Sequence, residues 1–557
     1  MSHRPKIVAA AVGDCVHVAG LARFCRLAEE AGYDTVFLGP AVEPEDLVQR
    51  IAEERPDIVG VSYRLTPEAG ERVVRRLLEL VRARGLDRPR FWFGGTPPVA
   101  ERMRALGAFE AVFDGREDDA ALIARLRGRA AEAAEPVPAG RLVDRIAQQY
   151  PYPLIRHHYG EPSFEKTLAG VRQLAERRVL DVISLGVDQN TQEHFFRPEE
   201  MDPLQDGAGG VPVRTPEQFR QLYLASRRGN FPLLRSYSGT RDMLKMARVL
   251  VETIDLAWGA IPLTWYSRLD GRSRVPLVEH IREAQETMRW LGAHDVPVEM
   301  NESHHWSLRD APDSVAVAMA FLAAYNPKAC GVRHYVAQYM FNTPPGTSFK
   351  MDLAKMLAKI ELIEGLQDET FTVFRETRTG LSSLPADLDL AKGHLASSVF
   401  LQMALRPHIV HVVAHVEADH AATPDDVEEA VKIARGAIRN ALDGQPDMAR
   451  DPDVQARKAE LVEEARLLLE AIREIAEPGV ADPWADAATI AKAVNIGLID
   501  AAHLRNNPEA RGQVRVRIVD GACRAVDPET GRVLSEAERV RRVLERARPR
   551  RAWAAAV

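Results

Sequence analysis

The sequence contains few cysteines, no long apolar run and no excess of basic charge. Its four cysteines, at positions 15, 25, 330 and 523, are scattered, which argues against a disulfide framework, a zinc site and the three-cysteine cluster of a radical S-adenosylmethionine protein. No apolar run has the length of a membrane span, and the N-terminus lacks the apolar segment of a signal peptide. A formal net charge of -7 gives no electrostatic basis for binding nucleic acid or anionic lipid. These absences predict a protein of the reducing cytoplasm, with no nucleic-acid or membrane partner.

The composition is typical of a multidomain globular protein. With 557 residues, 46% hydrophobic and 27% charged, the chain is too long for one hydrophobic core. Alanine, glutamate and proline dominate residues 130–140, which is typical of a linker. We therefore expect a first domain at residues 1–129, a linker and helical approach at 130–175, a strand-and-helix domain at 176–445 and a helix-rich region at 446–557.

The first domain alternates short apolar runs with amphipathic stretches. Residues 6–12, 57–61 and 90–93 have the composition of buried parallel strands, and apolar side chains recur at helical spacing between residues 21 and 28. This alternation predicts an α/β domain of the flavodoxin-like (Rossmann-like) type. His17 follows the first expected strand, at the carboxyl edge of the sheet, where open α/β folds bind their ligands.

Three short motifs follow these expected strands. Between the first motif and the second lie 41 residues, and 28 residues separate the second from the third. The motif residues are Asp14, His17 and Gly20, then Ser62 and Leu65, then Gly94 and Gly95. They resemble the fingerprint of the B12-binding domain of base-off, His-on cobalamin enzymes, which is Asp-x-His-x-x-Gly, Ser-x-Leu and Gly-Gly. Two positions depart from that fingerprint, because Asp14 lies three residues before His17 instead of two and Leu65 lies one position late.

The resemblance implies a cobalamin cofactor whose cobalt is coordinated by His17. A neutral imidazole is a good ligand for cobalt, and a neighbouring carboxylate such as Asp14 would fix its tautomer. Ser62 would form a hydrogen bond with the displaced nucleotide base. The glycines would allow the bulky cofactor to approach the backbone.

Beyond residue 175, further apolar runs alternate with long amphipathic stretches such as residues 278–291 and 314–325. This alternation predicts a TIM-like (β/α)8 barrel, followed by a helix-rich region with short strands near residues 514–519 and 531–534. The expected barrel strands are residues 180–184, 231–235, 258–262, 296–300, 331–336 and 408–413.

The barrel region resembles the catalytic subunit of glutamate mutase (methylaspartate mutase), with the corrinoid subunit fused ahead of it. The matching segments are residues 186–192, 229–232, 239–242, 275–282, 486–500 and 531–532. The resemblance implies adenosylcobalamin as the cofactor, radical chemistry supplied by that cofactor, and a homodimer of fused chains.

The same resemblance assigns roles to six residues. In that family arginines hold the substrate carboxylates, and the planar guanidinium suits this role because it engages a carboxylate through two hydrogen bonds. Arg228, Arg235 and Arg282 match these arginines, Glu302 matches the carboxylate that receives the substrate amino group, and His415 and Asp419 match the pair that contacts the cofactor ribose. The histidines at 408, 411, 415 and 420 could suggest a metal site, but they do not share one face of a strand, so we expect no shared metal.

These observations predict an adenosylcobalamin-dependent carbon-skeleton mutase that acts on an amino acid or a small dicarboxylic acid. Two alternatives remain open. A corrinoid methyltransferase would share the cofactor, although such enzymes usually carry a helical cap before the B12 domain. A non-catalytic B12-binding sensor or carrier would fit the altered spacing of Asp14 and the replaced ribose contacts. An aminomutase that also uses pyridoxal phosphate would need a lysine in a suitable context, and the sequence offers none.

Overall fold

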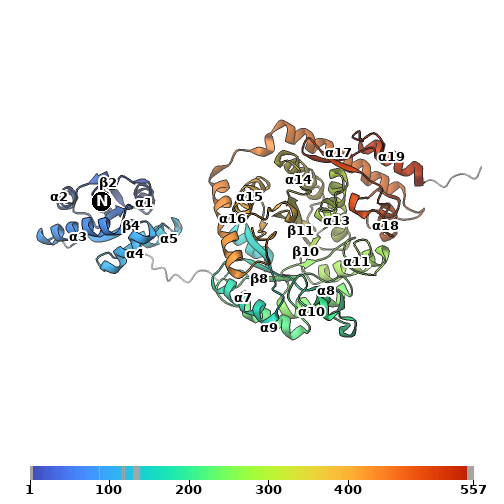
Figure 1. The fold of residues 1–557 in the computed structure, drawn as a ribbon, viewed down its shortest axis with the longest axis horizontal. Helices are drawn as coiled ribbons and strands as arrows, with labels where there is room; N and C mark the ends of the chain where they lie inside the picture. Colours follow the sequence, from blue (N-terminus) through green and yellow to red (C-terminus); the bar gives the residue numbers. More distant parts are fainter. Residues whose placement is uncertain are drawn as a thin grey trace, which may run out of the picture. The chain divides into compact units, whose positions relative to one another are not determined.

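The computed structural model describes residues 4–547 except 87, 116, 118, 129–137 and 301, and it leaves the side chains of 119–121 and 303 undescribed. It divides into two compact units, residues 1–137 and 138–557 (Figure 1). None of the described helices is both long enough and apolar enough to cross a lipid bilayer.

The N-terminal unit is a five-stranded parallel sheet with helices on both faces. The strand order is β2-β1-β3-β4-β5, so β2 lies on one side of β1 and the later strands lie on the other. In open α/β sheets, ligands bind at such a switch in strand order, outside the carboxyl ends of the strands. Helix α1 contacts α5 on one face, and α3 contacts α2 and α4 on the other. The strands are β1 Lys6–Val12, β2 Asp34–Val42, β3 Ile58–Tyr63, β4 Arg90–Gly95 and β5 Ala111–Phe113. The helices are α1 Ala19–Glu30, α2 Pro44–Glu54, α3 Pro67–Ala83, α4 Pro97–Leu106 and α5 Asp119–Leu126.

Burial explains why β1, β3 and β4 were visible in the sequence. Every residue of β3 is buried, and so is every residue of β1 after the first. A strand that is covered by helices on both faces has no solvent-facing side, and it therefore consists of a continuous apolar run. The predicted flavodoxin-like α/β fold is confirmed.

The second unit is an eight-stranded parallel barrel surrounded by helices (Figure 1). One sheet has the order β8-β7-β6-β13-β12-β11-β10-β9, and a bridge between Tyr237 and Ala260 joins its two edges. The strands are β6 Leu154–Tyr159, β7 Val182–Leu185, β8 Leu233–Ser236, β9 Gly259–Ala260, β10 Val298–Met300, β11 His334–Phe341, β12 Thr372–Thr379 and β13 Ile409–His411. The helices are α7 Phe164–Glu176, α8 Gln189–His194, α9 Pro216–Ser226, α10 Met243–Ile254, α11 Leu277–Ala293, α12 Glu302–Ser307, α13 Asp313–Ala329, α14 Phe349–Glu364, α15 Leu388–Gln402 and α16 Pro424–Gly444. The predicted TIM-like barrel is confirmed.

Helix α6 (Leu142–Gln149) closes the amino-terminal end of the barrel. Its Leu142 and Ile146 belong to one buried apolar cluster with the residues that begin several strands, among them Leu154, Val182, Leu233 and Ile409. Burial of apolar surface contributes about 25 cal/mol per Å², so this cluster holds the helix in place. The barrel therefore has an apolar floor at its amino-terminal end.

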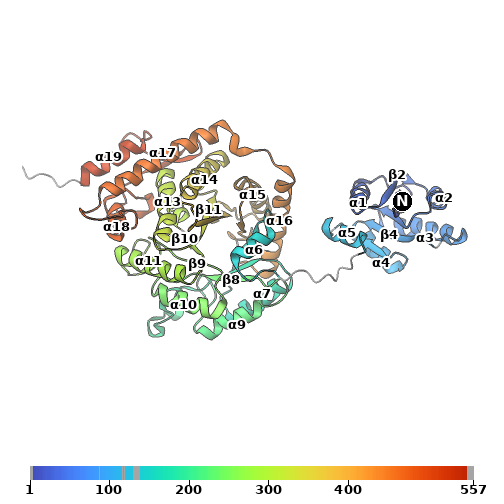
Figure 2. The same ribbon diagram turned by 180° about the vertical axis from the view of Figure 1, so that it is seen from behind.

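The C-terminal region wraps one side of the barrel (Figure 2). Helix α17 (Pro452–Glu474) packs on α13 and α14, α19 (Glu536–Ala547) packs on α17, and α18 (Ala487–Ile496) packs on α11. A short antiparallel hairpin of β14 (Val516–Val519) and β15 (Ala522–Ala525) lies between α18 and α19 in the chain.

Three details differ from the sequence-based expectations. β6 lies within the segment 130–175, which we expected to be a linker and a helical approach, and β12 was not predicted at all. Residues 531–534 form only a bridge between Val526 and Val533, because β14 pairs with β15 instead. Most of the linker expected at residues 130–140, namely 130–137, lies outside the described residues.

Candidate functional site

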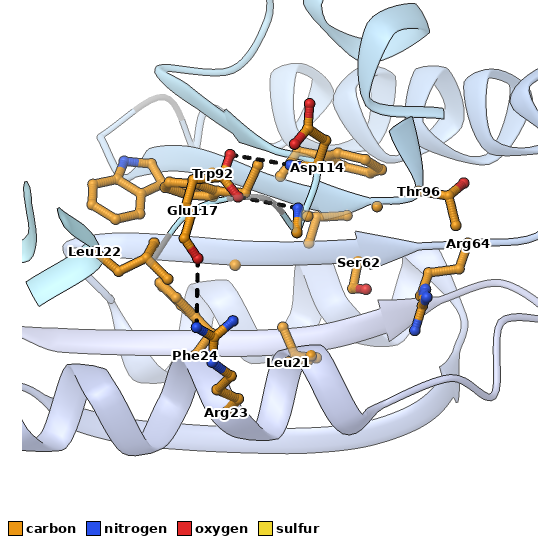
Figure 3. A pocket seen from close by; sticks show the side chains of 18 of the residues that line it. Leu21, Arg23, Phe24, Ser62, Arg64, Trp92, Thr96, Asp114, Glu117 and Leu122 are labelled. Carbon is orange, nitrogen blue, oxygen red and sulfur yellow. Dashed lines mark hydrogen bonds between the residues drawn. The ribbon is translucent and has the colours of Figure 1, made fainter. Parts of the chain in front are cut away.

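A pocket of about 220 Å³ opens along the sheet of the N-terminal unit, and we call it the sheet pocket (Figure 3). Leu21 and Phe24 of α1 line one wall, and residues of β3 and β4 line another. Trp92 lies at one end of the pocket, and Thr96 lies at the other, which is the carboxyl end of β4 (Figure 3). The pocket therefore opens at the sheet edge where a ligand is expected.

The loop after β5 closes one side of the sheet pocket. The side chain of Glu117 accepts hydrogen bonds from the backbone amides of Asp114 at 3.2 Å and Gly115 at 3.0 Å (Figure 3). Arg23 of α1 donates a hydrogen bond to the backbone carbonyl of Glu117 at 3.5 Å. These hydrogen bonds fix the loop internally and hold it against α1, so they keep this side of the pocket in place.

Glycines keep the sheet pocket open. A Cβ atom at Gly94 would meet no other atom within 4 Å, and the same holds at Gly20 and Gly115. A bulky group can therefore approach the backbone at these positions. Gly95 instead allows close packing against the backbone of β3, because a Cβ there would lie 2.7 Å from the backbone oxygen of Tyr63.

The structure brings most of the predicted motif residues together. Gly20, Ser62, Gly94 and Gly95 all line the sheet pocket. Leu65 does not line it; this residue follows β3, and its side chain is 40% exposed.

His17 lies in the loop between β1 and α1, at the same edge of the sheet. Its side chain is exposed, and within the described part of the chain no hydrogen bond reaches its ring. Asp14 does not orient His17, because its carboxylate accepts a hydrogen bond from the Tyr63 hydroxyl at 3.0 Å. Burial and this hydrogen bond raise the pKa of Tyr63 to about 12. The extra residue in the motif, Cys15, is buried, so the departure in spacing changes which partner Asp14 takes.

A second pocket, of about 700 Å³, occupies the carboxyl end of the barrel, where barrel enzymes place their active sites. We call it the barrel pocket. Among the described residues, its polar lining consists of six histidines, three arginines, three tyrosines and one glutamate. These are His157, His158, His304, His305, His411, His503, Arg272, Arg309, Arg378, Tyr159, Tyr237, Tyr266 and Glu417.

Arg378 is a buried cation of the barrel pocket. It comes from the carboxyl end of β12, and it is only 6% exposed. Its guanidinium has no hydrogen-bond or ion-pair partner within the described residues, and its Nε is both buried and unsatisfied. Burial lowers its pKa, but a guanidinium stays protonated in proteins. A buried, unpaired cation is unfavourable, so this site is suited to an anionic ligand.

Five histidines of the barrel pocket are neutral at ordinary pH. Burial lowers the pKa of each of them, to about 4 for His157, and the Arg378 guanidinium lowers each further; the five are His157, His158, His304, His305 and His411. The rings of His158 and His411 stack, with their centroids 4.7 Å apart. The described residues include no group of three or more His, Cys, Asp or Glu side chains able to hold a metal ion.

A buried charged layer lies in the barrel next to this pocket. The carboxylate of Glu299 accepts hydrogen bonds from Arg235 Nη2 at 2.9 Å, Arg156 Nη1 at 3.1 Å, Trp258 Nε1 at 2.5 Å and Gln338 Nε2 at 3.0 Å. Burial alone would raise the pKa of Glu299, but Arg156 and Arg235 outweigh it and hold that pKa below its usual value. Glu376 also pairs with Arg156. Burial nevertheless raises the pKa of Glu376 to about 7.

The three predicted substrate arginines lie outside the barrel pocket. Arg235 is fully buried, and its guanidinium is engaged by Glu299 through Nε and Nη2. Arg228 lies in the loop that leads into β8, at the amino-terminal end of the barrel, where it pairs with Glu176 at 2.9 Å. Arg282 is exposed on α11.

The other three residues to which the resemblance to glutamate mutase assigns roles, Glu302, His415 and Asp419, also lie outside the lining of the barrel pocket. Glu302 is fully buried at the start of α12 and accepts hydrogen bonds from the backbone amides of Leu263 and Thr264. Burial raises its pKa against these hydrogen bonds. His415 Nε2 lies 3.5 Å from Glu429 Oε2. Asp419 Oδ2 forms a hydrogen bond with His420 Nδ1 at 2.6 Å.

The sequence analysis missed the cations that do line the barrel pocket, which are Arg272, Arg309 and Arg378. A signal for Arg378 was present, because Phe374, Glu376 and Arg378 are spaced two residues apart, as on one face of a strand.

Comparison with known proteins supports the assignment of the first unit. Residues 5–123 match the family model of the B12 binding domain. The N-terminal unit is therefore a B12-binding domain. No curated protein matches the chain.

Solved structures with similarity to the chain include proteins of several kinds. A novel cobalamin-binding protein from Desulfitobacterium hafniense DCB-2 is 27% identical, with a TM-score of 0.20, and the match covers 23% of this chain and 59% of that protein. The YdjI aldolase from Escherichia coli K12 is 13% identical over 61% of this chain and 97% of its own, with a TM-score of 0.27. The cobalamin-dependent S-adenosylmethionine radical enzyme OxsB is 11% identical over 86% of this chain and 69% of its own, with a TM-score of 0.17.

Proposed function

We propose that this protein is an adenosylcobalamin-dependent isomerase that rearranges the carbon skeleton of a small carboxylic acid in the barrel pocket. The observation that carries the proposal is the unpaired guanidinium of Arg378, in a chain that also contains a B12-binding domain. A carboxylate is the natural ligand of such a group, because it accepts two parallel hydrogen bonds from one guanidinium.

The residues of the N-terminal unit fit the proposed cofactor. His17 is exposed and offers an imidazole nitrogen for cobalt, and Gly20 and Gly94 leave open space beside the sheet. Ser62 offers a hydroxyl in the same pocket. When bound, adenosylcobalamin would supply the carbon-centred radical chemistry that amino-acid side chains do not provide.

The barrel residues would bind, orient and shield the acid. Arg378 would fix the carboxylate, and the neutral rings of His158 and His411 would offer hydrogen bonds without adding charge. Tyr237 and Met340 line the same pocket and would exclude water from the reacting carbons.

The proposal is tested by reconstituting the full-length protein with adenosylcobalamin and adding carboxylic and amino acids one at a time. We expect one class of acid to produce a Co(II) electron paramagnetic resonance signal coupled to an organic radical. We also expect tritium to move from the labelled adenosyl group into that acid. Cofactor binding with neither result for any acid would contradict the proposal and favour a sensor or carrier. Methyl transfer from methylcobalamin would favour a methyltransferase.

Substitution of Arg378 by glutamine should weaken binding of the acid. A hydrogen bond to a charged group contributes about 1.5–3 kcal/mol, so we expect the dissociation constant to rise roughly 10- to 150-fold. Isothermal titration calorimetry on the full-length protein measures it. Arg228→Gln is the matched control, because Arg228 lies at the opposite end of the barrel. An equal loss in both variants would show that Arg378 does not anchor the acid.

Substitution of Gly94 by leucine should block cobalamin binding while the protein stays folded. The open space around Gly94 lies inside the sheet pocket, so the added side chain would fill the pocket without striking the core. Absorbance titration with cobalamin measures binding, and circular dichroism reports the fold. Gly393→Leu is the control, since Gly393 also has open space around it but lies on α15. Unchanged cobalamin affinity in Gly94→Leu would exclude the sheet pocket as the cofactor site.

A further inference from the structure

The barrel pocket contains a second group of cations besides Arg378. Arg272 and Arg309 both face Asp270: Arg272 Nε and Arg309 Nη2 each lie 3.4 Å from the same atom, Asp270 Oδ2. The Asp270 side chain is only 3% exposed. Two guanidiniums therefore share one carboxylate, and the group keeps a net positive charge.

Aromatic rings hold these two guanidiniums in place. The Cζ atom of Arg272 lies 4.2 Å from the ring centroid of Tyr266, and that of Arg309 lies 4.1 Å from the ring centroid of Trp265. A guanidinium that is packed on a ring keeps its N–H groups along its edge, where an anion can approach. Asp270 occupies part of that edge, and Arg309 Nη1 also donates to the backbone oxygen of His305 at 3.1 Å. The N–H groups of Arg272 and Arg309 outside these contacts are available to a ligand.

Both cationic groups belong to one continuous pocket. Its wall between them is a row of rings with successive centroid distances of 5.6 Å from His158 to Tyr237, 5.9 Å from Tyr237 to Tyr266 and 5.5 Å from Tyr266 to His305. At one end of this row His158 stacks on His411, whose strand pairs with β12 at Arg378. At the other end His305 Nδ1 lies 3.3 Å from Arg309 Nη1. An elongated molecule along this wall would contact Arg378 at one end and the Arg272–Arg309 pair at the other.

The barrel pocket offers little to an ammonium group. Among the described lining residues, Glu417 is the single carboxylate. The carboxylates near the pocket already have partners. Asp270 has the two arginines, Glu299 has Arg156 and Arg235, and Glu376 has Arg156. Glu302 has the amides of Leu263 and Thr264. Arginine outnumbers free carboxylate in the lining, which favours a ligand with two negative charges.

We propose that the substrate is an acid with two anionic groups and no ammonium group, one anionic group bound by Arg378 and the other by the Arg272–Arg309 pair. This inference rests on the proposed function, in which the barrel pocket holds the substrate, and it names the substrate class. It differs from the amino-acid substrate that the resemblance to glutamate mutase implies, because Glu302 is enclosed by its own hydrogen bonds and does not line the pocket.

The test compares acids that differ in one group, by titration calorimetry on the full-length protein. Succinate is set against aspartate and butyrate, and glutarate against glutamate and pentanoate. We expect at least one diacid to bind ten-fold or more tightly than both its amino-acid and its monoacid counterpart. Arg309→Gln should reduce binding of that diacid at least ten-fold and leave monoacid binding within two-fold. Arg272→Gln tests the same group if Arg309→Gln does not fold.

Several outcomes would overturn this inference. An amino acid that binds as tightly as its diacid, with the affinity lost in Glu417→Gln, would show that Glu417 receives an ammonium group. Equal loss of monoacid and diacid binding in Arg309→Gln would show that the Arg272–Arg309 pair does not bind a second anionic group. These results are separate from the isomerase test. A radical signal with an amino acid would overturn the proposed substrate class but not the isomerase reaction. A diacid that binds as expected but gives no radical signal would overturn the isomerase reaction but not the substrate class.

Discussion

The Glu299→Gln variant should lose about 3–5 kcal/mol of unfolding free energy, the usual result of removing one partner from a buried ion pair. Glu299 is fully buried and takes hydrogen bonds from both Arg156 and Arg235, which are also fully buried. Glutamine has the same shape but no charge, and its amide would face guanidinium donors. Two buried cations would then share Glu376 alone. A change below 1 kcal/mol would show that the layer is not held by charge.

Urea unfolding followed by near-ultraviolet circular dichroism measures this change, and Glu376→Gln is the matched control. The folded-state pKa of Glu376 is about 7, above the ordinary glutamate value, so the folded protein favours the protonated side chain. That group stabilises the fold at low pH, and its contribution is lost as the pH rises through 7. Glutamine stays neutral, so Glu376→Gln should gain stability relative to the natural protein between about pH 4.5 and 7. Equal destabilisation by both variants at pH 7 would contradict this assignment of charge.

Substitution of His17 by alanine should remove the nitrogen ligand of the cobalt. Loss of a residue that merely supports a metal ligand typically lowers metal affinity about 10- to 100-fold, and we expect at least that loss in cobalamin affinity. The ring of His17 is exposed and bonded to no other described residue, so it is available as a ligand without rearrangement. Because the side chain of His17 is exposed, the variant should keep its fold.

Two measurements separate ligation from simple contact in the His17 variant. Protein labelled with 15N-histidine and loaded with Co(II) cobalamin should show nitrogen splitting from the protein in its electron paramagnetic resonance spectrum, and His17→Ala should abolish it. Asp14→Asn should change cobalamin affinity less than ten-fold, because Asp14 bonds to Tyr63 rather than to His17. A loss as large as that of His17→Ala would mean that Asp14 turns to His17 when cobalamin binds. Unchanged splitting in His17→Ala would exclude His17 as the ligand.

The strands that could be predicted from the sequence are those with continuous apolar runs. β1 and β3 are covered on both faces, and their composition shows it. β6 and β12 were missed because the barrel interior at these strands is charged. Arg156, Glu376 and Arg378 interrupt the apolar pattern at the positions that face inward. The sequence rules therefore failed at two of the strands that line the barrel pocket, whereas β13, which carries His411, was predicted.

The two sites were also unequal in how well they could be predicted. Ser62, Gly94 and Gly95 lie at the carboxyl ends of β3 and β4, and Gly20 lies in the first turn of α1, which follows β1. Their meeting in one pocket therefore follows from the fold. In the barrel, resemblance of short segments could not show which end of a strand or which face of a helix a residue occupies. Arg228 precedes its strand and Arg282 points outward, whereas Arg272 and Arg309 reach the pocket from loops.

The barrel is unequally stiff around its circumference. β11 and β12 pair in unbroken register over eight positions, and α17 packs on the outer helices α13 and α14. The seam between β9 and β8 depends on β9, which has two residues, and on a bridge from Ala260 to Tyr237. Arg378 stands on the stiff half, while Tyr266 and Arg272 follow the compliant seam. We therefore expect the distance between the two cationic groups to adjust at this seam, so that the barrel would accommodate proposed diacids that differ by a carbon in length.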